Sequence, residues 1–91
     1  MNNEKLHTVP TLAWRKIERN TYIIDTATNM LHELNETGST IWKLIVAGKT
    51  PLQIAEMLTA EYDVNPDEAK KDVFTLIDTL LKKGVLLKKP S

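Results

Sequence analysis

The sequence predicts an α+β fold that is winged helix-turn-helix-like, with a three-stranded antiparallel sheet followed by three helices. Two observations lead to this class. Three short runs of strand-forming residues come first, at a spacing typical of an antiparallel meander. Three segments with helical periodicity follow, and a capping residue precedes each of them. A short apolar tail, residues 85–87, can add a final strand.

The predicted strands lie within the first 34 residues. They are Leu12–Glu18, which alternates weakly between polar and apolar residues, Thr21–Asp25 and Met30–Leu34. Tight turns are expected at Arg19–Asn20 and at Ala27–Asn29, because these residue types suit turns. Since short turns join neighbouring antiparallel strands, the three runs indicate a meander.

Each predicted helix has its own start signal. Asn35 ends the third strand and can cap the first helix, which Gly48 would terminate. Thr50 opens the sequence TPLQ, a capping box with proline at the first helical position. Asn65 opens NPDE, which repeats this pattern. The third helix is therefore predicted to run from residue 66 to about residue 83, where Gly84 follows.

The third predicted helix has a wider apolar face than a packed helix needs. Its apolar residues form two adjacent stripes: Ala69, Val73, Leu76 and Leu80 in the first, and Phe74, Ile77 and Leu81 in the second. One interpretation is a helix sandwiched between the sheet and the other two helices. The other is that one stripe packs inside while the second lines an open groove. The sequence alone leaves both interpretations open.

The composition bounds the class of protein. The 91 residues suffice for one domain, expected at residues 11–88 behind a flexible arm over residues 1–10. With 42% hydrophobic and 26% charged residues, the chain is not of the disordered class. It has no cysteine, and its twelve basic and twelve acidic residues cancel. No apolar run approaches the roughly 18 residues of a membrane span, so a soluble cytoplasmic protein is expected.

Residues that carry catalysis or bind metals are sparse. His7 and His32 are isolated, and the sequence has neither a metal-ligand spacing nor a glycine-rich phosphate loop. Glu33 and Glu36 flank the strand–helix junction, where solvated or capping roles suit them better than a catalytic pair. The acidic residues near the third helix suit its positive N-terminal end. We therefore predict a protein that is not an enzyme and has no cofactor or metal.

A winged-helix DNA-binding protein is the alternative that the fold class suggests. A recognition helix that lies against phosphates needs basic residues at its exposed positions. The charged residues at the exposed positions of the third helix are Asp67, Glu68, Asp72 and Asp78, against Lys70 and Lys71. Four acids against two lysines disfavour nucleic acid as the partner.

A family resemblance follows from the stretch between His32 and Leu86. A strand ends in LNET, a helix containing tryptophan follows, and a G-x-T link leads to an IAxxL helix. The sequence YDV, an acidic helix start and a closing GVL complete the series. In order and spacing this resembles the PqqD-like proteins, also called RiPP recognition elements. The resemblance covers residues 11–87, and the size is similar to that of free-standing members.

The resemblance implies a fold and a function. The family sheet and helices bind the leader segment of a ribosomally made precursor peptide. They present it to a separate maturation enzyme, such as a radical SAM enzyme, a leader peptidase or a cyclase. The leader adds as a fourth strand at the edge of Met30–Leu34. This addition gives a use to unpaired edge groups that are otherwise an aggregation hazard. Apart from the resemblance, an unpaired edge strand could also pair with a second copy and give a homodimer.

The resemblance also implies which residues bind the leader. The backbone of the third strand would pair with it through Met30, Leu31, His32, Glu33 and Leu34. The third helix would supply the groove wall through Lys70, Val73, Phe74, Leu76, Ile77, Leu80 and Leu81, and Lys71 is a further partner for leader acids. Because successive side chains of a strand point to opposite faces of the sheet, Met30, His32 and Leu34 share one face and Leu31 and Glu33 share the other. This pattern does not indicate which face meets the leader's anchor residues.

Overall fold

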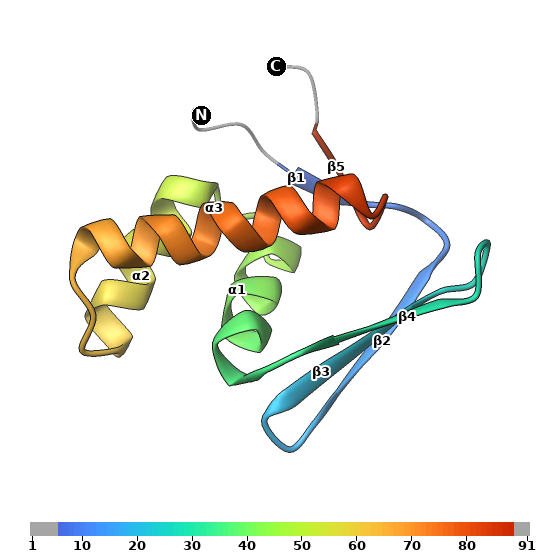
Figure 1. The fold of residues 1–91 in the computed structure, drawn as a ribbon, viewed down its shortest axis with the longest axis horizontal. Coiled ribbons are helices and arrows are strands. Elements are labelled where there is room, and N and C mark those ends of the chain that lie inside the picture. The colour runs from blue at the N-terminus through green and yellow to red at the C-terminus, as the bar shows by residue number, and fades with distance from the viewer. Residues whose placement is uncertain (1–5, 89–91) are drawn as a thin grey trace.

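A computed structural model gives the structure of this chain and describes residues 6–88. Figure 1 shows the elements in chain order. They are β1 (Leu6–Thr8), β2 (Leu12–Ile17), β3 (Asn20–Asp25), β4 (Met30–Leu34), α1 (Glu36–Val46), α2 (Pro51–Glu61), α3 (Pro66–Lys82) and β5 (Leu86–Lys88). The three-stranded sheet followed by three helices confirms the predicted fold class.

The main sheet is an antiparallel meander with strand order β2-β3-β4. Trp14 pairs with Ile23 across the first hairpin, and Ile23 pairs with His32 across the second. Residues that pair directly share a face, so these three side chains lie on one side of the sheet. The first turn lies one residue earlier than predicted, because Asn20 already belongs to β3 and Glu18 adopts a positive φ of 57°.

The N-terminal segment differs from the predicted flexible arm. Leu6–Thr8 forms a strand that pairs antiparallel with Leu86–Lys88 in a separate two-stranded sheet. Leu6 is 8% exposed and belongs to the hydrophobic core. A three-residue strand is too short to show a period of two, and its partner lies far along the chain, so the sequence pattern missed it. Residues 1–5 of the predicted arm lie outside the described residues.

The helix starts follow the predicted capping chemistry. The side chain of Asn35 accepts a hydrogen bond from the backbone N–H of Gly38, at 2.9 Å. Thr50 and Gln53 form a reciprocal capping box, and Asn65 accepts from the N–H of Glu68. Each cap supplies a partner for an N–H group that the first helical turn leaves free. Gly48 has a φ of +90°, as expected for the residue that terminates α1.

Helix α1 occupies the centre of the molecule. It packs against β3, β4, β1 and α2, while α3 packs mainly against α2 and β5 (Figure 1). Trp42 of α1 is 0% exposed, and its ring meets that of Trp14 edge to face at 6.1 Å. Its indole nitrogen has no hydrogen-bond partner, a cost that burial of so large a ring offsets. Since α1 covers the sheet, α3 is not sandwiched between the sheet and the other helices.

Within residues 6–88, none of the helices combines the length and apolar character that crossing a membrane requires.

Replacing Thr50 with alanine should destabilise the fold by about 1 kcal/mol, because α2 loses its N-cap. Urea unfolding measures this loss. Thr75→Ala is the matched control, since Thr75 lies exposed within α3 and caps no helix. The control should be neutral or slightly stabilising, because alanine is the better helix former. Equal losses in the two variants would contradict the capping role.

Candidate functional site

Strand β4 has a free edge. It pairs with β3 on one side, and no other described strand pairs with its opposite side. The outer edge of β2 is also free among the described strands, but β2 carries Arg15 and Lys16, which discourage pairing with another strand. Glu33 is the one Asp, Glu, Lys or Arg residue in β4. The β4 edge is therefore the one better suited to accept a further strand.

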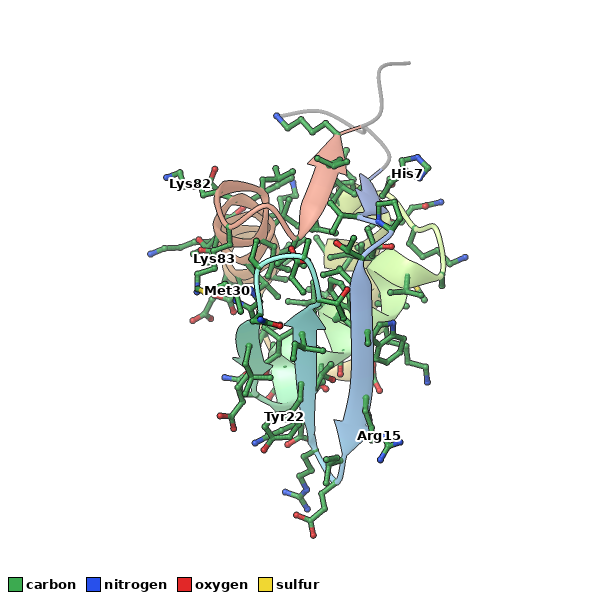
Figure 2. All side chains as sticks on the ribbon, turned by 90° about the vertical axis from the view of Figure 1, so that its right-hand side faces the viewer. His7, Arg15, Tyr22, Met30, Lys82 and Lys83 are labelled. Carbon is green, nitrogen blue, oxygen red and sulfur yellow. The ribbon has the colours of Figure 1, made fainter. Side chains whose placement is uncertain are left out.

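The side chains of β4 alternate between two environments. His32 and Leu34 are each 7% exposed and face the helices, whereas Leu31 is 64% exposed and lies with Glu33 on the outer face. Met30 shares the inward face by register but is still 55% exposed at the strand start (Figure 2). The structure thus settles which side of β4 faces the helices.

A groove lies beside the end of β4. It encloses about 480 Å³ between the N-terminal half of α1 and one flank of α3, and we call it the α1–α3 groove. Its lining residues are Asn35, Thr37, Gly38, Ile41, Lys71, Asp72, Thr75, Leu76 and Thr79. In Figure 1 α3 runs across the upper part of the molecule with β4 below it, and in Figure 2 both lie on the same side, with β2 on the other. The groove and the free edge are therefore neighbours.

Gly38 lies at the inner end of this groove, close to the end of β4. A Cβ atom at this position would lie 3.2 Å from the Cβ of Leu34 and 3.7 Å from Cδ2 of Leu76. Its φ is not in the left-handed region, and glycine within a helix costs roughly 1 kcal/mol relative to alanine. The reason for glycine is therefore space at the junction of β4 and α1, where Asn35 Oδ1 would also lie 3.3 Å from such a Cβ atom.

The groove combines apolar and polar contacts. Leu76 provides apolar surface above the buried Ile41, while Thr37, Thr75 and Thr79 provide hydroxyl groups. Lys71 and Asp72 add one charge of each sign at the exposed rim. Over residues 6–88 no three His, Asp or Glu side chains come together as metal ligands. An unpaired strand edge next to such a groove is suited to holding an extended chain.

The predicted wall residues on α3 divide into three groups. Leu76 lines the α1–α3 groove. Val73, Ile77 and Leu80 are no more than 1% exposed and lie in the hydrophobic core, so their side chains support the groove from beneath rather than line it. Phe74, Leu81 and Lys70 lie on the other flank of the core-facing stripe by helical spacing, and Lys70 lines a different hollow between α2 and α3. Whether any of them contacts a ligand stays a prediction.

The groove-lining residues that were not predicted are mostly polar. Asp72, Thr75 and Thr79 share a flank of α3 with Leu76, at the helical spacing of three and four residues. The prediction followed apolar stripes and so missed this flank. The spacing was visible in the sequence, but only the packing of α3 shows that this flank faces the groove.

Asp25 fixes the turn that leads into β4. Its Oδ1 accepts a hydrogen bond from the hydroxyl of Thr11 at 2.8 Å and another from the N–H of Ala27 at 3.0 Å. Its backbone carbonyl accepts from the N–H groups of Thr28 and Asn29. The Thr11 hydroxyl, followed by the Ala27 N–H, holds the pKa of Asp25 below its ordinary value, and His32 acts in the same direction against the effect of burial.

Comparison with known proteins gives one family and one fold. The sequence model of the family described as "Coenzyme PQQ synthesis protein D (PqqD)" matches residues 20–86. A solved structure described as "Lasso peptide synthetase B1 complexed with the leader peptide" superposes with a TM-score of 0.85 at 24% identity, covering 91% of this chain and 98% of that chain. A second, "TbiB1 in Complex with the TbiA(beta) Leader Peptide", gives 0.85 at 24% identity, with 92% and 98% covered. No curated protein sequence matches the chain.

Lowering the pH should remove the stability that ionised Asp25 contributes. Because its pKa is lower in the folded chain than the ordinary 3.8, the contribution is complete above that ordinary value and is lost as the pH falls through the folded pKa. The free energy of unfolding of the wild type, measured with urea, should therefore fall more between about pH 5 and pH 2 than that of Asp25→Asn. The variant has no such charge to lose. Parallel pH dependences for the two proteins would contradict this role.

Proposed function

The chain belongs to the PqqD family, and we propose that it binds the leader segment of a ribosomally synthesised precursor peptide without catalysing a reaction. In this role it presents the peptide to a separate modifying enzyme, for which a radical SAM enzyme, a leader peptidase and a cyclase are the candidate classes. The observation that carries the proposal is the free edge of β4 beside the α1–α3 groove.

Strand addition is the binding mode that suits this site. A fourth strand on β4 would satisfy edge N–H and C=O groups, which gives affinity for many sequences. Alternate side chains of that strand would point toward the helices, on the same face as His32 and Leu34, and so toward the α1–α3 groove. Selection among peptides would then come from the groove. The two similar folds, whose descriptions name bound leader peptides, support this class of ligand.

The contact residues we propose differ from those suggested by apolar stripes alone. The β4 backbone from Met30 to Leu34 provides the pairing edge. Leu76, with Thr75 and Thr79 beside it, provides the side-chain contacts on α3. Of the two adjacent lysines, Lys71 is the one placed at the groove to meet an acidic leader residue.

Two alternatives compete for the same surface. A second copy pairing through β4 would give a homodimer and would exclude the leader. DNA binding would need a basic face on α3, yet its exposed residues include four acids against three lysines. Nothing in the geometry of the groove favours DNA, so leader binding is the stronger proposal.

Amide hydrogen exchange tests strand addition directly. In an edge strand, alternate N–H groups point away from the sheet and exchange readily. Adding a peptide that corresponds to the leader of a precursor encoded beside this gene should protect those alternate amides within residues 30–34. Amides of β2 serve as the internal control and should not change. Protection confined to β2, or protection that rises with protein concentration when no peptide is added, would contradict leader addition at β4.

Leu76→Ala should weaken binding of the same peptide by about tenfold, because the groove loses apolar contact area. Leu81→Ala is a matched control. Both leucines are half-buried on α3 and pack against the core, but only Leu76 lines the groove. Calorimetric titration gives the affinities, and a thermal melt checks that each variant is folded. Ile77 is unsuitable for this test, since it is fully buried. Equal affinities of the two variants would remove Leu76 from the site.

A further inference from the structure

A second groove lies along a different flank of α1. It encloses about 560 Å³ between the inner face of β2, α1 and the C-terminal half of α2, and we call it the α1–α2 groove. From α1 it is lined by Thr40, Lys43 and Leu44, whereas the α1–α3 groove is lined by Thr37, Gly38 and Ile41. At 100° per residue the centres of these two sets lie about 115° apart around the helix, and the two grooves share no lining residue within residues 6–88. One groove can therefore be filled while the other is occupied.

The α1–α2 groove has the residue types of an interaction surface. Its floor includes Leu44, which is half-buried, and Met57, which is 40% exposed. Trp14 is 43% exposed and lies two residues before Lys16, on the same face of β2. Tryptophan and methionine are enriched in protein interfaces, and methionine adapts its shape to a partner. Met57 is the residue of this kind in the groove itself, while Trp14 lines a separate hollow on the sheet.

The charges at this groove are mostly positive. Lys16 and Lys43 stand at its rim, and Glu61 is the acid among its lining residues. Within residues 6–88, neither lysine forms an ion pair with an acid of the chain. The chain as a whole has a net charge of zero, so these lysines form a local basic site rather than part of a general basic surface. A partner that matches this groove needs acidic residues beside apolar ones.

We propose that the α1–α2 groove docks an acidic segment with apolar anchor residues on the surface of the enzyme that modifies the bound peptide. The identity of this partner rests on the proposed leader-binding function. The apolar anchors contact Leu44 and Met57, and the acids pair with Lys16 and Lys43. Because the two grooves share no lining residue in the described part of the chain, peptide and enzyme are held at the same time by one small domain.

Direct binding between the purified chain and the purified modifying enzyme encoded beside its gene tests this docking without any peptide. The double variant Lys16→Glu/Lys43→Glu should lower the affinity at least about tenfold at low salt, because attraction becomes repulsion at two positions. Met57→Gln tests the apolar floor without a charge change. Lys49→Glu is the control, since Lys49 is exposed just after α1 and lines neither groove. Thermal melts show that each variant is folded.

The expected result is loss of enzyme binding in the double variant, a smaller loss in Met57→Gln, and wild-type behaviour in Lys49→Glu. Added salt should weaken binding of the wild type more than that of the double variant. Unchanged affinity in both groove variants overturns the proposal, and so does a wild-type chain that does not bind the enzyme. Leader affinity is titrated separately. A chain that binds the enzyme but no leader therefore disproves the proposed function and leaves the docking groove standing.

Discussion

The junction at Asn35 is the constraint on which the candidate site depends. With its φ and ψ in the extended region, Asn35 ends β4, and its side chain caps α1 at the N–H of Gly38. Four residues beyond the cap, the hydroxyl of Ser39 accepts from Thr21 at 2.7 Å and approaches the carbonyl of Leu34. The free edge stops where the groove begins, so one short segment sets the relative position of both.

This arrangement makes the site largely pre-formed. The groove walls belong to α1 and α3, whose inward faces are fixed in one hydrophobic core around Trp42, Val73 and Ile77. A peptide strand would therefore bind to an ordered strand edge and an ordered groove wall. The conformational entropy lost on binding would come mainly from the peptide itself. The cost of keeping such an edge open is a risk of unwanted pairing. Its five residues limit that risk, because a short edge offers few unpaired backbone groups.

Much of the fold was predictable because its signals are local. Asn35, Thr50 and Asn65 each cap a helix through an atom three residues away, and such contacts leave a readable pattern in the sequence. Strand β1 was not predictable, since it exists only by pairing with β5 at the other end of the described chain. The candidate site was predictable only in part. The sequence predicted the edge strand β4, but only tertiary packing shows that the flank of α3 with Thr75 faces the α1–α3 groove. The apolar stripes in the sequence identified the buried face of α3 rather than the face that lines the groove.

The pairing of β1 with β5 brings the two ends of the described chain together, and neither strand lines the α1–α3 groove or the α1–α2 groove (Figure 1). Another domain covalently joined at either end would therefore depart from the same place and would leave both surfaces accessible. Such a linkage would raise the effective concentration of the joined domain near the bound peptide. The linker length sets the size of this effect, and no new contact is needed. The fold is thus equally compatible with acting as a separate chain and with acting as a module within a longer one.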